Sequence, residues 1–321
     1  MQMDVNISVD LRESIEQLTQ GIPVPDIKRT VRSISSRYKD ESGQGKRLIA
    51  TDPDARVYSA FRFPATYGAV TDALSYVTEF FDDDIKSMTD IGAGSGAATW
   101  SSSRFWDMEK MLLLEREEGM RNVGSLLMKD TYLEELVTWQ SFDLIRDAIP
   151  AKSDLVISSY VLNELSDTDL IPSVRKMWDA ADKLMVIVEP GTPEGFKVIK
   201  KIRAELLLLG GHIVAPCTHE GPCQLADDDW CHFTCRIMRS KLHKFIKDAE
   251  VPYEDEKYCF IACSREPADR SSLRVLRHPR IDKGRIGIRA CTPEGIEDIT
   301  YRKSDGLFKK AKKCKQGDSL E

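Results

Sequence analysis

The pattern of apolar and polar positions changes character near residue 86. Before that point, apolar residues recur every three or four positions over residues 11–18, 27–38 and 70–81, and Gly or Pro residues interrupt the pattern. This spacing places apolar side chains on one face of a helix, so we expect this part to be helical. After that point, short continuous apolar runs alternate with helical patterns. The alternation predicts a parallel sheet with helices on both faces.

The apolar runs of the second part predict its strands and helices. Five parallel strands are expected at residues 86–91, 110–115, 135–140, 154–159 and 183–189. Helices are expected at residues 97–105, 118–128, 196–209 and 236–249. A further strand is expected at residues 258–264, followed by a hairpin over residues 284–301 that turns at Thr292-Pro-Glu-Gly295.

Composition places the chain among globular proteins. Hydrophobic residues make up 41% of the 321 residues and charged residues 31%, and no apolar run is long enough to span a bilayer. Residues 1–18 carry several acidic side chains and lack both the apolar core of a secretory signal and the arginine-rich composition of a transit peptide. We therefore expect a cytoplasmic protein.

Cysteines and charges are distributed unevenly along the chain. All eight cysteines follow residue 216, and without a secretion signal they argue against a disulfide framework. Residues 265–321 carry 15 Lys and Arg against 9 Asp and Glu, a net charge of +6, so the first 264 residues carry −12. A basic end on an acidic body indicates either a local contact with a polyanion or a solvated surface.

A glycine-rich turn follows the first predicted strand. It reads Asp90-Ile-Gly92-Ala-Gly94-Ser-Gly96, and its spacing differs from the Gly-x-Gly-x-x-Gly of dinucleotide sites. Glycines at this point let the backbone approach a ligand at the carboxyl edge of the sheet. We expect Asp90 and these glycines to surround the methionine part of S-adenosylmethionine. Glu115 is expected to accept hydrogen bonds from both ribose hydroxyls, and Asp143 to reach the adenine amino group.

These features predict an α/β fold. We expect a class I S-adenosylmethionine-dependent methyltransferase sheet, Rossmann-like, with an N-terminal helical extension, an inserted cysteine loop and a C-terminal β-hairpin extension. The expected parts are an N-terminal helical region, a methyltransferase-like domain that includes a cysteine loop at residues 215–235, and a basic C-terminal extension. Their expected bounds are residues 1–69, 70–264 and 265–321.

Candidate catalytic groups are few. The fourth predicted strand ends in Ser158-Ser-Tyr-Val-Leu-Asn163-Glu164, without the Asp/Asn-Pro-Pro-aromatic motif of exocyclic-amine methylases. No cysteine lies near the strand ends, where cytosine C5 methylases carry their nucleophile. Asn163 and Glu164 are expected to start a helix or line the pocket, and Glu189 to form part of the pocket wall. No general base can be named, so the catalytic residues are unknown at this stage.

Three cysteines lie close together in a loop rich in Pro, Gly and Asp. Cys217, Cys223 and Cys231 are six and eight positions apart, wider than the cysteine pairs of zinc ribbons. Four thiolates fit either a tetrahedral zinc or a four-iron cluster, and the wider spacing favours the cluster. Cys291 precedes the predicted hairpin turn, where its side chain can point at another loop. It is our candidate for the fourth ligand.

The other His and Cys residues have simpler interpretations. His219 and His232 are the alternatives to Cys291 as the fourth ligand. Cys235 is expected to face away along a helix, and Cys314 to be free in a Lys-rich segment. The two remaining cysteines, Cys259 and Cys263, are expected to be buried thiols in an apolar strand. A set of reduced cysteines that bind no metal is the simplest alternative.

Several segments resemble the small-ribosomal-subunit methyltransferase-like family, whose mitochondrial members help to assemble the small mitoribosomal subunit. The segments are Ala65-Thr-Tyr67, Asp90-Ile-Gly-Ala-Gly-Ser-Gly96, Ser159-Tyr-Val-Leu-Asn-Glu-Leu165, Val188-Glu-Pro-Gly-Thr-Pro-Glu-Gly195, Ala215-Pro-Cys-Thr-His-Glu220 and Trp230-Cys-His-Phe233. The resemblance implies a class I methyltransferase fold, S-adenosylmethionine binding, contact with small-subunit rRNA and a four-iron, four-sulfur cluster. The cluster cysteines of the family correspond here to Cys217, Cys223, Cys231 and Cys291.

The resemblance leaves methyl transfer open, because some members act as assembly factors without clear catalysis. Our main hypothesis is an S-adenosylmethionine-binding, iron–sulfur protein that methylates small-subunit rRNA or acts in ribosome assembly and translation. The alternatives are a non-catalytic ribosome-assembly factor and a zinc-bearing methyltransferase of a small molecule or protein. If RNA is the partner, basic residues of the C-terminal extension are expected to contact phosphates. These are Arg274, Arg277, Arg280, Lys283, Arg285, Arg289 and the lysines of residues 309–313.

Overall fold

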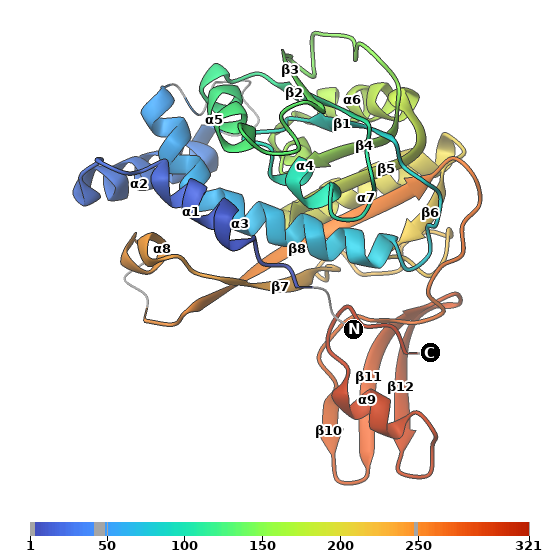
Figure 1. Ribbon diagram of the computed structural model, residues 1–321. Helices are drawn as coiled ribbons and strands as arrows, with labels where there is room; N and C mark the ends of the chain where they lie inside the picture. The colour runs from blue at the N-terminus through green and yellow to red at the C-terminus, as the bar shows by residue number, and fades with distance from the viewer. Residues whose placement is uncertain (1–3, 42–48, 50, 247–249, 321) are drawn as a thin grey trace.

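The computed structural model describes residues 4–41, 49, 51–246 and 250–320. A large mixed sheet lies between layers of helices, and a smaller sheet formed by the C-terminal residues lies below it in Figure 1. No helix in these described ranges is long and apolar enough to cross a membrane.

The large sheet has five parallel strands and an antiparallel edge. Its strands are β1 (Ser87–Ile91), β2 (Lys110–Glu115), β3 (Val137–Ser141), β4 (Ser153–Ser159), β5 (Ala181–Pro190), β6 (His212–Ala215), β7 (Phe233–Met238) and β8 (Tyr253–Ser264). Their order is β3-β2-β1-β4-β5-β8-β6, and β7 also pairs with β8. Strands β1 to β5 pair in parallel, whereas β8 runs antiparallel to β5, β6 and β7. This arrangement confirms the predicted Rossmann-like class I methyltransferase fold.

Helices cover both faces of this sheet. The principal ones are α3 (Asp52–Val77), α4 (Ala97–Ser102), α5 (Glu118–Met128), α6 (Asp167–Ala180) and α7 (Pro193–Leu208). Apolar residues of α3 and α4 form one core with strand residues such as Leu155 and Val186. Residues of α6 and α7 form a second core with the alternate strand residues, such as Val156 and Ile187. The near-continuous apolar runs of the strands follow from this burial on both faces.

Side-chain caps set the starts of three of the helices that cover the large sheet. Thr51 accepts a hydrogen bond from the Asp54 N–H at the start of α3, and a proline follows it in the first turn. Ser166 and Thr192 cap α6 and α7 in the same way. The side-chain oxygen of each accepts a hydrogen bond from the backbone N–H three residues later. Each cap satisfies a backbone donor that has no partner inside the helix.

The N-terminal helices pack onto α3 and α5. Helix α1 (Val9–Gln17) places Leu11 and Ile15 in a core with Phe63 and Leu127, and α2 (Val24–Glu41) packs on the other side of α3. Helix α3 passes through residues 69 and 70 without a break, although the sequence places a boundary there. The division of the chain at this point therefore stays a prediction.

The helix expected at residues 236–249 is wrong over its first part. Strand β7 occupies Phe233–Met238, and only α8 (Lys241–Ile246) is helical, while residues 247–249 lie outside the described ranges. Burial alternates along β7, so that Phe233, Cys235 and Ile237 are buried between exposed neighbours. This period of two marks a strand with one face on the core. Cys235 consequently lies in the main core instead of facing away.

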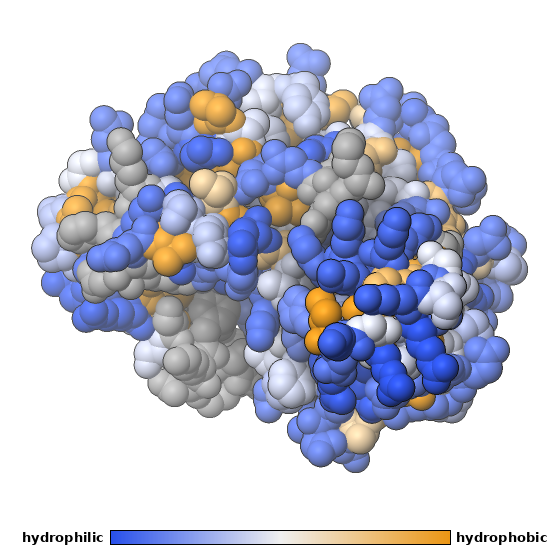
Figure 2. All heavy atoms as spheres, turned by 90° about the horizontal axis from the view of Figure 1, so that it is seen from below, coloured by the Kyte–Doolittle hydropathy of each residue, from blue (hydrophilic) through white to orange (hydrophobic). Residues whose placement is uncertain are grey.

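The C-terminal extension forms its own small sheet. Its strands are β9 (Arg274–Val275), β10 (Arg280–Asp282), β11 (Arg285–Thr292) and β12 (Gly295–Arg302), and a short helix, α9 (Phe308–Lys313), packs on them. The predicted hairpin is confirmed, because β11 and β12 pair from Arg285↔Arg302 to Thr292↔Gly295. Ile286, Ile288 and Ala290 face α9 and form a separate core. Figure 2 shows that mostly hydrophilic residues cover this extension from below.

A buried carboxyl links α3 to β8. The Tyr258 hydroxyl donates a hydrogen bond of 2.7 Å to Asp72, whose side chain is almost fully buried. Burial raises the pKa of Asp72 from 3.8 to about 6, although the hydrogen bond from Tyr258 opposes the shift. The folded state therefore holds the proton more tightly than the unfolded chain, and stability falls as pH rises from about 4 to 6.

We predict that Asp72→Asn stabilises the protein more at pH 8 than at pH 4, by a difference of about 2–3 kcal/mol. The asparagine cannot ionise, so the variant avoids the cost of a buried charge at high pH. Urea denaturation at both pH values measures the difference. Asp83→Asn, at an exposed position before β1, serves as the control. An equal pH dependence for the two variants would contradict the assignment.

Candidate functional site

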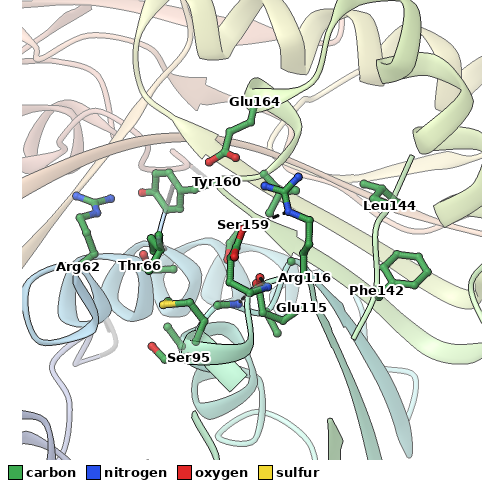
Figure 3. Close-up of a pocket in the computed structure, with 18 of the residues that line it drawn as sticks. Arg62, Thr66, Ser95, Glu115, Arg116, Phe142, Leu144, Ser159, Tyr160 and Glu164 are labelled. Atoms are coloured by element: carbon green, nitrogen blue, oxygen red, sulfur yellow. Dashed lines mark hydrogen bonds and ion pairs between the residues drawn. The ribbon is translucent and has the colours of Figure 1, made fainter. Parts of the chain in front are cut away.

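A cavity of about 440 Å³ lies at the carboxyl ends of the parallel strands. The loops after β1, β2, β3 and β4 line it, and α3 closes one side with Arg62 and Thr66. In Figure 3, Phe142 and Leu144 lie on one side of this space, and Tyr160, Arg62 and Thr66 lie on the other. Ligands of open α/β sheets bind at this edge, so this cavity is the candidate binding site.

The glycine-rich turn shapes the floor of the cavity. Gly92, Gly94 and Gly96 have φ angles of +66°, +57° and +89°, which L-residues with side chains rarely adopt. A Cβ on Gly92 would lie 2.4 Å from a methyl carbon of Val161, so a side chain has no room there. Gly92 and Gly94 line the cavity, whereas Gly96 lies outside it and starts α4.

Asp90 lies below this turn instead of in the cavity. Its side chain is fully buried, and Oδ2 accepts a 2.9 Å hydrogen bond from the Thr99 hydroxyl. Its Oδ1 atom is buried with no partner in the described part of the chain. Burial raises the pKa of Asp90 to about 7. Because Asp90 does not line the cavity and bonds Thr99 of α4, this geometry assigns it to holding α4 rather than to direct contact with a ligand.

Glu115 and Asp143 both line the cavity, as their expected roles require. Glu115 ends β2, and its carboxylate accepts hydrogen bonds from the backbone N–H groups of Gly94, at 2.8 Å, and Glu117, at 2.7 Å. Burial raises the pKa of Glu115, although both bonds act in the opposite direction. Asp143 follows β3 and accepts a 3.0 Å hydrogen bond from the N–H of Ile145. The structure thus brings Gly92, Gly94, Glu115 and Asp143 around one space.

Residues after β4 line the opposite side of the cavity, and sequence reasoning gave the first of them no role. Tyr160 has φ of +60°, unusual for a residue with a side chain. Its hydroxyl donates a 3.0 Å hydrogen bond to Glu256 on β8, which also forms an ion pair with Arg62. Glu164 lines the cavity, as expected, at the end of a 3₁₀ turn over Leu162–Glu164. An aromatic and an acidic residue follow the end of β4, and this sequence signal could have predicted that the segment lines the cavity.

Glu189 is not part of the cavity wall, contrary to expectation. It is fully buried at the end of β5, and its Oε1 atom accepts a 2.8 Å hydrogen bond from the Leu162 N–H. Burial raises the pKa of Glu189 to about 8. The carboxyl therefore holds the turn that carries Glu164.

The four candidate ligand cysteines meet at a second, smaller cavity. Cys217, Cys223, Cys231 and Cys291 all line a space of about 40 Å³ between α7, β8 and the end of β11. Burial, followed by the proximity of the other three thiols, raises the pKa of Cys231. Among the described residues, no group of three or more His, Cys, Asp or Glu side chains is arranged to hold a metal ion as it stands.

The remaining cysteines and histidines differ in their relation to this cavity. Cys259 lines it and donates a hydrogen bond to the Pro190 carbonyl, while Cys263 is buried in the same strand. His219 lines the cavity, but His232 does not and lies against the ring of Trp230. Cys314 lies at the end of α9, where it donates to the Ala311 carbonyl.

Two arginines expected to contact phosphates instead hold the cysteine loop. Arg274 is only 2% exposed, and it donates to the carbonyls of Pro216 and Gly317 while its guanidinium lies over Tyr76. Arg277 forms an ion pair with Asp229 and donates to the Trp230 carbonyl. The phosphate-contact prediction is therefore wrong for Arg274, whose guanidinium is buried, whereas for Arg277, with its side chain 32% exposed, it stays a prediction.

Solved structures and curated proteins share similarity with this chain. The magnesium protoporphyrin IX methyltransferase of Synechocystis is 12% identical, with coverage of 81% of this chain and 100% of its own and a TM-score of 0.42. The N-methyltransferase NodS of Bradyrhizobium japonicum is 11% identical, with coverage of 61% and 84% and a TM-score of 0.39. Human "Ribosome assembly protein METTL17, mitochondrial" is 24% identical over 278 residues, which are 78% of this chain and 58% of that protein.

The curated relatives also correct one expectation. The fission yeast "Rsm22-cox11 tandem protein 2, mitochondrial" is 26% identical over 274 residues, which are 77% of this chain and 35% of that protein. This chain thus spans less than two thirds of the length of either relative. Both relatives are mitochondrial, which overturns the expected cytoplasmic location. That expectation depended on residues 1–18, which lie outside the part of the chain that matches the family.

The family match covers most of the chain. Residues 52–321 match the family described as "Mitochondrial small ribosomal subunit Rsm22". The matched part includes every described strand of both sheets, all residues that line the large cavity except Ile49, and all four candidate ligand cysteines. The chain belongs to the Rsm22 family of the mitochondrial small ribosomal subunit.

Proposed function

We propose that this chain is a methyltransferase-like factor in the assembly of the small mitochondrial ribosomal subunit. In this proposal it binds S-adenosylmethionine in the large cavity and a four-iron, four-sulfur cluster in the cysteine cavity. Membership of the family and the names of the relatives support the ribosomal role. The observation that carries the cofactor assignment is the 440 Å³ cavity, which joins a glycine turn to a buried carboxylate at the carboxyl edge of the sheet.

The residues of the large cavity fit S-adenosylmethionine. The backbone of Gly92 and Gly94 would lie along the methionine part, Glu115 would accept hydrogen bonds from the ribose hydroxyls, and Asp143 would face the adenine amino group. Phe142 and Leu144 supply apolar walls beside Asp143. When bound, the cofactor supplies a methyl group that its sulfonium has already activated. The protein then needs chiefly to orient an acceptor and exclude water.

We predict that Glu115→Gln weakens binding of S-adenosylhomocysteine about tenfold or more. The amide keeps the size of the side chain but loses one acceptor oxygen and the negative charge, and such charged hydrogen bonds contribute about 1.5–3 kcal/mol each. Isothermal titration calorimetry measures the change. Glu109→Gln, exposed just before β2, is the matched control. Unchanged affinity in Glu115→Gln would contradict the ribose assignment.

The donor set of the small cavity fits a cluster better than a single zinc. Four thiols from two distant segments surround one space. The cysteine sulfurs that bind the corners of a cluster lie farther apart than those that bind one ion, so four thiols around a hollow suit a cluster. Cys217, Cys223 and Cys231 would bind from the loop, and Cys291 from β11. A bound cluster would supply a crosslink between that loop and the C-terminal sheet.

We predict about four iron and about four sulfide per chain after anaerobic purification, with brown colour. Cys223→Ser is expected to lose most of both, because a hydroxyl is a poor substitute for a thiolate ligand. Cys314→Ser, which removes a thiol outside the cavity, is expected to keep both. One zinc per chain without sulfide would contradict the cluster and favour the zinc-bearing alternative.

An exposed face of the small sheet fits contact with rRNA. Arg285 and Arg302 are direct cross-strand partners. Arg280 and Arg289 share their face, where Arg289 also forms an ion pair with its own cross-strand partner, Asp298. All four side chains are exposed, and the opposite face of the sheet packs on α9. We call this set the arginine face. Like charges placed directly opposite destabilise a sheet, so the pair is explained if a phosphate backbone neutralises it.

We predict that Arg285→Gln weakens binding to a short single-stranded RNA of mixed sequence and reduces the salt dependence. Each phosphate contact contributes about 0.7 to the slope of log affinity against log salt for single strands. Fluorescence anisotropy over a salt series measures both quantities. Arg29→Gln, whose side chain is 78% exposed on α2, is the control. An equal effect from both variants would show that only general charge matters.

A further inference from the structure

The cysteine cavity has buried positive charge in its wall and no carboxylate beside it. Arg203 of α7 and Arg274 of β9 line the cavity among the thiols, and they are only 5% and 2% exposed. No Asp or Glu is found among the described residues that line this space. A charge that is buried without a partner of opposite sign is strongly destabilising, so this wall is suited to an anion.

The acidic residues of the neighbouring segments do not supply that anion. Three of them pair with other arginines: Glu205 of α7 with Arg175, Glu220 of the cysteine loop with Arg270, and Asp229 of the same loop with Arg277. Lys200 also lines the cavity, but it is partly exposed and lies 3.7 Å from the surface residue Asp227. Neither Arg203 nor Arg274 forms an ion pair with a carboxylate in the described part of the chain.

Arg203 reaches the cavity from one stripe of α7. Phe196, Ile199, Lys200 and Arg203 all line the cavity, and their spacing of three and four positions places them on one face of the helix. A buried arginine at the end of such a stripe has no role in apolar packing that a leucine could not fill. Its position therefore indicates a polar role at the cavity.

The Arg203 guanidinium holds the part of the cysteine loop that carries two candidate ligands. Its Nη2 atom donates hydrogen bonds of 2.8 Å to the His219 carbonyl and 2.7 Å to the Gly221 carbonyl. Both carbonyls lie between Cys217 and Cys223 in the sequence. Because two bonds from one nitrogen fix this turn, Arg203 helps to set where the two thiols lie.

One donor of Arg203 is left over beside the thiols. Its Nε atom is buried and has no hydrogen-bond partner within the residues that the structure describes. Burial raises the pKa of the Cys217 thiol, and the charge of Arg203 opposes that rise, so the guanidinium lies near this candidate ligand. Buried polar groups almost always have a partner, so an unused donor in a cavity wall indicates a bound group that accepts a hydrogen bond.

We propose that Arg203 is a positioning residue that holds the ligand loop and places its charge and its Nε–H against a bound four-iron cluster, which favours the reduced cluster. This inference rests on the proposed function, which assigns the cluster to this cavity. Four thiolates outweigh the positive charge of the cluster core, so the site is anionic, and one added electron makes it more so. Nearby positive charge and hydrogen bonds to the sulfurs stabilise the more negative state and raise the reduction potential.

The test measures the reduction potential of the cluster in the whole chain, purified without oxygen. A europium(II) chelate gives one electron to the cluster and becomes europium(III), and no bond forms or breaks in the protein. The EPR signal of the reduced cluster, followed against the applied potential, gives the ratio of reduced to oxidised cluster. A group that only held the loop would leave this ratio unchanged wherever the cluster is fully loaded.

Two variants separate the charge of Arg203 from its bonds to the loop. Arg203→Gln loses the charge but keeps an amide donor, and we expect the ratio at a fixed potential to fall about tenfold or more, which is a shift of about 59 mV for one electron. Arg203→Lys keeps the charge, and its ratio is expected to stay within about threefold of the wild-type value. Lys201→Gln, which removes an exposed cation from the same helix, is the matched control and is expected to change nothing.

Three results would overturn the role of Arg203. These are an unchanged ratio in fully loaded Arg203→Gln, an equal fall in Arg203→Gln and Arg203→Lys, and a wild-type cluster that the europium chelate cannot reduce. If Arg203→Gln loses its cluster, iron and sulfide content becomes the readout. Arg203→Lys is then expected to keep both, and an equal loss would assign Arg203 to loop packing alone. One zinc per chain without sulfide fails the proposed function itself, which is a separate result.

Discussion

The antiparallel placement of β8 between β5 and β6 is the constraint on which both candidate sites depend. Successive side chains of a strand point to opposite faces of the sheet, so β8 contributes side chains to both faces. On one face, Glu256 fixes Tyr160 and Arg62 at the large cavity, and Tyr258 bonds the buried Asp72 of α3. On the other face, Cys259 lines the cysteine cavity. The same strand also carries β7 beyond the parallel part of the sheet.

Much of the fold could be predicted, because its signals are local. Continuous apolar runs locate β1, β2, β4 and β5 to within two residues, since strands buried on both faces contain few polar positions. The glycine turn and the carboxylate at the end of β2 follow from the geometry of a strand–turn–helix unit. The convergence of Cys217 with Cys291 was expected from the family resemblance, and the structure brings both thiols to one cavity.

What the sequence did not reveal depends on contacts between distant segments. Residues 236–249 have helical spacing, but pairing with β8 makes their first part a strand, because tertiary contacts outweigh local propensity. Arg274 resembles its basic neighbours in composition, yet its donors are used by carbonyls 58 and 43 residues away. Tyr160 is fixed at the cavity by a hydrogen bond to Glu256, 96 residues later, and no local pattern predicts that contact.

The separation of Cys217 and Cys291 along the chain has a consequence for biosynthesis. A ribosome releases the loop that carries Cys217, Cys223 and Cys231 well before it makes β11, so three thiols are exposed before the fourth exists. The Arg274 guanidinium donates to the carbonyls of both Pro216 and Gly317, so this set of hydrogen bonds is complete only after Gly317 has been made. Domains fold in the order of their synthesis. The contacts around the cysteine cavity are therefore complete only after both Cys291 and Gly317 have been made.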